Sequence, residues 1–224
     1  RAFQEARTAP TGPTFVAMSA NAFDDTADVD LIPSSETAIS PSADPKLIED
    51  ICRLIAGAQR PILIVGDRVL DTDGTGSAVA VAEAGGMRAY GHGSTGVNFP
   101  ANHPLWQGNL NMRTVEAVAA VRSADVVVAV GCPVFEDFFY QPGQFIEAKS
   151  KLVHIDINAD AIGKSEPTDI GIVASPGKAL AQLAEALTLG LNGSEIEAVR
   201  GRSKEAAAES KAYSEAFRKL ASVS

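Results

Sequence analysis

From residue 44 to residue 189 the chain alternates between apolar stripes at helical spacing and short runs that are apolar throughout. The first stripe consists of Leu47, Ile48, Ile51, Leu54 and Ile55. It predicts a helix that begins at Asp44, whose side chain can cap the first turn, with Pro45 in the first helical position. Similar patterns predict helices over residues 77–84, 114–124 and 176–189.

The apolar runs predict strands near residues 61–66, 87–90, 125–131, 151–156 and 169–174. A strand that is apolar along its whole length is typical of a parallel sheet buried on both faces. Strands that alternate with helices along the chain form such a sheet through crossover connections. We therefore expect an α/β fold with one parallel sheet that is covered by helices on both sides.

The two ends of the chain differ from this pattern. Residues 1–9 predict the last turns of a helix, and residues 14–18 (TFVAM) predict a short strand. Residues 19–42 are mainly polar and include two prolines, which predicts an extended linker between domains. The residues after Asn192 are rich in Ala, Glu, Lys and Arg and predict an exposed helix that leads toward another domain. Because the chain starts at Arg1 within its first helix, we expect it to be a segment of a longer protein.

Composition and charge limit the possible functions. The 224 residues carry a formal net charge of −9 and are 46% hydrophobic, which fits a buried core. The negative charge repels nucleic acid and anionic lipid, and no apolar run approaches the roughly 20 residues that span a bilayer. We therefore expect no nucleic-acid or membrane partner. Cys52 and Cys132 lack any metal or redox spacing, so two reduced thiols are favoured over a disulfide, which indicates a cytoplasmic setting.

Several predicted strands end in glycine or an acid and continue into a loop. In an open parallel sheet, ligands bind at the carboxyl ends of the strands, near the point where the strand order reverses. The candidate cofactor-binding residues are therefore Gly66, Asp67, Gly91, Gly131 and Asp156. The segment after the first strand, GDRVLDTDGTG, matches neither GxGxxG nor the GxxxxGK of phosphate-binding loops. Glycines in such loops also serve turns and helix starts, and we favour that interpretation over a nucleotide site.

Other side chains of chemical interest favour structural roles, and we predict neither a catalytic residue nor a metal ligand. No two of the histidines His92, His103 and His154 have metal-ligand spacing. His154 lies inside a predicted strand and is expected in the core, and His103 is expected in a turn. Four aromatic residues follow the strand at 125–131, and packing against a neighbouring domain is favoured over a role in a substrate wall: Phe135, Phe138, Phe139 and Tyr140.

Five segments carry a family resemblance: HPLWQG (103–108), LNMRT (110–114), SADVVVAVGCPVFED (123–137), VHIDINADAIGK (153–164) and IVASPGKAL (172–180). In this order they resemble the middle domain of thiamine-diphosphate enzymes, a family that includes acetolactate synthase, pyruvate oxidase, oxalyl-CoA decarboxylase and benzoylformate decarboxylase. Residues 131–146 are most similar to benzoylformate decarboxylase, whereas residues 155–164 are nearer to acetolactate synthase. Residues 12–18 are similar to the final strand of the preceding, pyrimidine-binding domain of the family.

The resemblance implies a Rossmann-like, three-layer domain with six parallel strands, in a parent enzyme that uses thiamine diphosphate and Mg²⁺. Some relatives hold FAD or ADP in this domain. Residues 133–137 lack the arginines of flavin-binding synthases, and residues 174–175 lack their Gly-Asp, which argues against FAD and favours ADP over it. Asp156 matches the strand-end acid of the family. The family's Gly-Asp-Gly motif and its cofactor-activating glutamate have no match in the chain, so the resemblance implies a segment that is not catalytic by itself.

These observations together predict the organisation of the chain. Residues 1–18 would end a pyrimidine-binding domain, 19–43 would be a linker, 44–190 the central domain, and 191–224 a helical connection toward a diphosphate-binding domain. The predicted function is that of a scaffold in a 2-oxo-acid decarboxylase or synthase. Its partners would be the neighbouring domains, within a cytoplasmic homodimer or homotetramer. The alternative is a free-standing module that binds FAD, ADP or NAD.

Overall fold

The computed structural model describes residues 1–30, 33, 35, 37–93, 96–135 and 143–221. The chain divides into two compact units, Arg1–Ser40 and Pro41–Ser224. Within the described residues, no helix combines the length and the apolar character that crossing a membrane requires.

The second unit contains one sheet of six parallel strands in the order β3-β2-β1-β4-β5-β6. The strands are β1 (Pro61–Val65), β2 (Arg88–His92), β3 (Trp106–Leu110), β4 (Val126–Val130), β5 (Lys151–Asp156) and β6 (Ile170–Val173). The helices are α2 (Pro45–Gly57), α3 (Asp67–Asp71), α4 (Thr75–Gly85), α5 (Val115–Ser123), α6 (Pro176–Gly190) and α7 (Gly193–Ala221), with a 3-10 turn at Ala159–Ala161. This strand order is that of the Rossmann fold, and it confirms the predicted six-stranded parallel α/β class.

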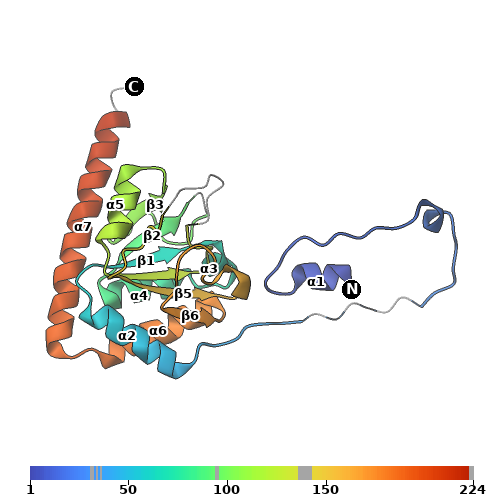
Figure 1. Cartoon of the computed structure of the whole chain (residues 1–224), viewed down its shortest axis with the longest axis horizontal. Helices are drawn as coiled ribbons and strands as arrows, with labels where there is room; N and C mark the ends of the chain where they lie inside the picture. Colours follow the sequence, from blue (N-terminus) through green and yellow to red (C-terminus); the bar gives the residue numbers. More distant parts are fainter. Residues whose placement is uncertain (31–32, 34, 36, 94–95, 136–142, 222–224) are drawn as a thin grey trace. The chain divides into compact units, whose positions relative to one another are not determined.

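Helices cover both faces of this sheet (Figure 1). On one face α2, α4 and α6 pack against alternate strand residues such as Leu63 and Val65. On the other face α5 packs against the intervening residues, such as Ile62 and Ile64. The central strands β1 and β4 are buried at every position, as their continuous apolar sequences predict.

The starts of two helices follow from their capping residues. Asp44 accepts a hydrogen bond from the backbone N–H of Lys46, with Pro45 in the first turn, as the sequence predicts. Thr114 caps α5 in the same way by accepting the N–H of Ala117 at 3.2 Å. A capping side chain satisfies a backbone donor that the helix itself leaves free.

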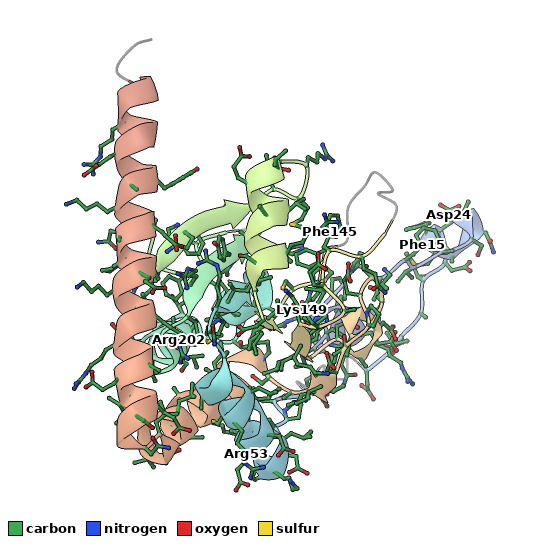
Figure 2. All side chains as sticks on the ribbon, turned by 60° about the vertical axis from the view of Figure 1, so that its left-hand side comes forward. Phe15, Asp24, Arg53, Phe145, Lys149 and Arg202 are labelled. Carbon is green, nitrogen blue, oxygen red and sulfur yellow. The ribbon has the colours of Figure 1, made fainter. Side chains whose placement is uncertain are left out.

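The helix α7 packs more closely on the sheet than the predicted exposed helix. Val199 and Ala206 are buried, and the side chain of Arg202 donates hydrogen bonds to the backbone oxygens of Ala58 and Gly85. Figure 2 shows Arg202 on the side of α7 that faces the domain. The prediction of a helix is therefore confirmed, and the prediction that it is exposed is wrong for this first part of α7.

Two arginines from the sheet hold α7 through a single acid. Arg88, which is fully buried, donates to Glu209 from Nε at 2.7 Å and from Nη2 at 2.8 Å. Arg60 donates to both oxygens of the same carboxylate at 3.1 Å. Charge-assisted pairs of this geometry are the strong ones, so this cluster fixes α7 to the strands.

The first unit contains the helix α1 (Ala2–Arg7) and a 3-10 turn at Ala20–Phe23. The predicted helix is therefore present, but residues 14–18 do not form the predicted strand. A strand needs a neighbour to pair its backbone N–H and C=O groups. Residues 14–18 have none in the described part of the chain, and Phe15 is 93% exposed.

Candidate functional site

The five candidate residues all lie toward the carboxyl ends of the strands. Val65 is in register with Gly91 on one side and Val130 on the other, and Val130 is in register with Ile155. Gly66, Gly131 and Asp156 are therefore the next residues at the ends of β1, β4 and β5. Asp67 follows as the first residue of α3. The strand order reverses between β1 and β4, so the fold places Gly66 and Gly131 at its usual ligand crevice.

Gly66 and Gly131 are required here by close packing of the backbone. A Cβ atom on Gly66 would lie 2.5 Å from the carbonyl oxygen of Gly131 and 2.4 Å from Cβ of Cys132. Gly131 has φ of +66°, and a Cβ there would lie 2.9 Å from the backbone nitrogen of Val69. Glycine alone fits such a conformation without strain. The packing accounts for both glycines without a ligand.

Asp156 pairs with an arginine that the sequence reasoning missed. Its side chain is fully buried and accepts hydrogen bonds from Nε of Arg68 at 2.8 Å and from Nη2 at 2.7 Å. It also accepts the backbone N–H of Asn158 at 2.8 Å. The two-point pair neutralises Asp156 inside the crevice. An arginine directly after the first strand could have signalled this contact, because it faces the strand-end acids of neighbouring strands.

Asp67 and Gly91 are also engaged by their surroundings. Asp67 accepts hydrogen bonds from the backbone N–H of Gly96 at 2.7 Å and from the side-chain amide of Asn98 at 3.0 Å. Gly91 lies against Asn109 of β3, where a Cβ would come within 2.1 Å of the Asn109 Oδ1 atom. Asp67 thus fixes the loop after β2, and Gly91 allows β2 and β3 to approach.

The first turn of α6 is covered by the turn between α3 and α4. Gly177 donates its backbone N–H to Oγ1 of Thr72 at 2.9 Å. A Cβ on Gly177 would lie 2.2 Å from the carbonyl oxygen of Thr72 and within 3.3 Å of Gly74. Free N–H groups at a helix start can bind anions, but here one of them already has a protein acceptor.

The buried histidine and cysteine beside the crevice are structural. His154 Nε2 lies 2.8 Å from the carbonyl oxygen of Cys132. Burial lowers the pKa of His154, so the ring is neutral and donates from Nε2. Burial raises the pKa of the Cys132 thiol to about 12 and that of Cys52 to about 11. Both cysteines are free thiols, as predicted.

The remaining sequence candidates have structural surroundings or fall outside the description. His103 lies 3.2 Å from the carboxylate of Glu83 and packs edge-on against Phe99, which confirms a role in a turn. Phe135 is buried and contacts Phe145. The other three aromatic residues of the predicted cluster lie in 136–142, outside the described residues.

A Rossmann-like sheet with a closely packed, internally paired carboxyl edge defines a class of domain, and comparison with known proteins specifies it. The family model "Thiamine pyrophosphate enzyme, central domain" matches residues 48–183. The chain belongs to this family of thiamine-diphosphate enzyme central domains. The matches give no support to the alternative of a free-standing FAD- or NAD-binding module.

Individual proteins agree with the family match. The Methanocaldococcus jannaschii protein named "Probable acetolactate synthase large subunit" is 29% identical over 197 residues, which are 83% of this chain and 32% of that protein. The acetolactate synthase large subunit of Corynebacterium glutamicum is 32% identical over 139 residues, 62% of this chain and 22% of that protein. The benzoylformate decarboxylase structure from Polynucleobacter necessarius has a TM-score of 0.68 at 21% identity, covers 82% of this chain and 34% of its own, and shows the shared fold. The chain thus spans about a third or less of the length of these relatives.

Proposed function

We propose that the chain is the central scaffold domain of a thiamine-diphosphate-dependent 2-oxo-acid decarboxylase or synthase. Its role is to hold neighbouring domains in place without supplying a group that reacts. The family match supports the enzyme class, and the acetolactate synthase relatives support chemistry on 2-oxo acids. The whole enzyme, in this proposal, is a cytoplasmic homodimer or homotetramer.

The observation that carries the scaffold role is the internal pairing at the carboxyl edge. Arg68 binds Asp156, the acid at the position where Rossmann domains contact ribose hydroxyls. Gly177, at the start of α6, already donates to Thr72. A nucleotide would have to break these contacts before it could use the same groups, and separating a buried ion pair costs about 3–5 kcal/mol.

Thiamine diphosphate with Mg²⁺ requires a different set of groups. Mg²⁺ is held by carboxylates and other oxygen ligands together with the cofactor phosphates. Among the residues that the structure describes, no three His, Cys, Asp or Glu side chains come together as a metal site. The acids of the edge, Asp67 and Asp156, already accept hydrogen bonds. These residues do not fit the metal-bound cofactor, and the proposal assigns it to other parts of the enzyme.

Two measurements on the purified chain test this function. With thiamine diphosphate, Mg²⁺ and either pyruvate or benzoylformate, we expect CO₂ release no faster than with the cofactor alone. In calorimetric titrations with FAD, ADP and NAD, we expect dissociation constants above about 10 μM, equivalent to a binding free energy weaker than about 7 kcal/mol. A full-length acetolactate synthase in the same CO₂ assay is the positive control.

The two measurements separate the possible errors. Sustained CO₂ release would show that the chain carries catalytic groups and is more than a scaffold. Binding of FAD, ADP or NAD below about 10 μM would show that the crevice is a working nucleotide site despite its internal pairs.

A further inference from the structure

A cavity of about 180 Å³ lies at the opposite edge of the sheet, where β5 and β6 begin. It is lined by residues just before β5, at 144–150, and just before β6, at 166–169. Its lining includes three apolar and three acidic residues: Ile146, Ala148, Pro167, Glu147, Glu166 and Asp169. The cavity is therefore separate from the crevice at the carboxyl edge.

Glu166 is the unusual residue of this cavity. It is only 4% exposed, and its Oε1 accepts the backbone N–H of Phe145 at 2.8 Å. Its Oε2 atom is buried and has no hydrogen-bond partner among the described residues. A buried carboxylate oxygen without a donor is unfavourable, because burial removes its water without replacing it. The cavity thus offers a strong acceptor that lacks its donor.

The other two acids of the cavity already have partners. Asp169 accepts from Nζ of Lys151 at 2.7 Å and from the backbone N–H of Leu152 at 2.9 Å. The side chain of Glu147 is 46% exposed and lies 3.7 Å from Nε of Arg122. The unmet requirement for a donor is therefore specific to Glu166 and is not a general property of an acidic surface.

We propose that this cavity binds a primary ammonium or guanidinium group carried on a short aliphatic stem. A cationic nitrogen would give Glu166 a charge-assisted hydrogen bond, while Ile146, Ala148 and Pro167 would contact the methylene groups. Typical sites for drug-sized ligands measure about 300–1,000 Å³, so a cavity of about 180 Å³ fits a group the size of a lysine or arginine side chain. This site is independent of the proposed scaffold function. The cation can come from a free amine or from a side chain of a second copy of the chain.

The test uses n-butylamine and propylguanidine, both cations near neutral pH, titrated into the ¹⁵N-labelled chain. We expect saturable shifts of the amide signals of Phe145 and Thr168, next to the cavity. The uncharged n-butanol has a similar stem and should bind about tenfold more weakly or less. Equal binding of butanol and butylamine, or no saturable shift with either cation up to about 100 mM, would overturn the proposal.

Two substitutions of equal charge identify the acceptor. Glu166→Gln keeps the size of the side chain and an acceptor for Phe145, and it should weaken butylamine binding about tenfold. Glu147→Gln removes the same charge at the same cavity and should change binding less than about twofold. Equal losses in both variants would reduce the site to non-specific attraction and overturn the proposal. If Glu166→Gln fails to fold, Ala148→Leu fills the cavity from an exposed position and should abolish binding while leaving the carboxylate in place.

Sedimentation distinguishes the two sources of the cation. If a side chain of a second copy occupies the cavity, the wild-type chain self-associates, and both Glu166→Gln and added n-butylamine should shift it toward monomer. If the ligand is a free amine, neither change should alter the sedimentation of the chain. Either result supports the site, provided that the amide shifts saturate and depend on Glu166.

Discussion

Replacing Glu209 with glutamine should weaken the attachment of α7 to the sheet. The Glu209 carboxylate receives two hydrogen bonds from Arg88 and two from Arg60. Glutamine has nearly the same shape but one acceptor oxygen and no charge. Arg88 is fully buried, so water cannot replace the lost acceptor. Glu205 lies 3.5 Å from Arg88 but is mostly exposed, and it can compensate only in part.

The size of the effect follows from the pKa of Glu209. The hydrogen bond from Arg88 is the main cause that lowers this pKa from 4.5 to about 2, with a further contribution from Arg60. At about 1.36 kcal/mol for each tenfold change in the acid constant, this difference is worth about 3.4 kcal/mol. The side chain is 39% exposed, however, and water screening reduces the contribution. We therefore expect Glu209→Gln to lower the free energy of unfolding by about 1–2 kcal/mol.

Urea denaturation of the chain at neutral pH measures this loss. The matched control is Glu197→Gln, which removes the same charge from the same helix at a position that is 69% exposed and pairs only locally with Arg200. Its effect should stay within about 0.5 kcal/mol. Equal unfolding midpoints for the two variants would refute the reasoning that Glu209 holds α7.

The same pair predicts a pH dependence. Because the pKa of Glu209 is lower in the folded chain than in the unfolded chain, its stabilisation is complete above about pH 4.5 and is lost as the pH falls toward 2. The stability difference between the wild-type chain and Glu209→Gln should therefore shrink to about a quarter near pH 2.5. A difference that stays constant over this range would contradict the assignment.

Two further substitutions test the packing of the carboxyl edge by urea denaturation. Arg68→Gln should leave the buried Asp156 without its cation and cost about 2–4 kcal/mol, whereas Arg53→Gln on the solvent side of α2 (Figure 2) should cost less than about 0.5 kcal/mol. Gly177→Ala should cost about 1–3 kcal/mol because its Cβ would lie 2.2 Å from a backbone oxygen at the end of α3. Gly76→Ala meets nothing within 4 Å inside α4 and should stabilise the chain by about 0.5–1 kcal/mol; a loss at Gly76 as large as that at Gly177 would contradict the packing argument.

The sequence predicted the central strands well because burial on both faces leaves a local signal. The runs PILIV and VVVAV are apolar at every position, and they form β1 and β4 at the centre of the sheet. The strand β3 (Trp106–Leu110) was missed as a separate element, because it lies at the sheet edge and is only partly buried. Its sequence WQGNL has neither a continuous apolar run nor regular alternation. Local pattern therefore predicts strands whose surroundings are uniform, and it fails at the edge.

Contacts between distant parts of the chain could not be predicted in the same way. Arg68 and Asp156 are 88 residues apart, and the sequence alone indicated an acid at the edge without its partner. The packing of α7 left a weak signal, since Val199, Arg202 and Ala206 recur at helical spacing and are all buried. That signal was obscured because charged and small residues dominate the rest of the helix. For residues 14–18 the local β-propensity was right, but a strand also needs a partner.

The two edges of the sheet differ in how their acids are satisfied, and this difference links the fold to the two proposals. At the carboxyl edge, the buried Asp156 has a cation and a backbone donor inside the domain, so its contribution is structural. At the amino edge, the buried Glu166 has one backbone donor and an oxygen without a partner beside a cavity. A buried acid whose partners are all internal stabilises the fold, whereas one that lacks a partner is set up to receive it from outside. Substitution of Arg68 should therefore be read out in stability, and substitution of Glu166 in the binding of cations.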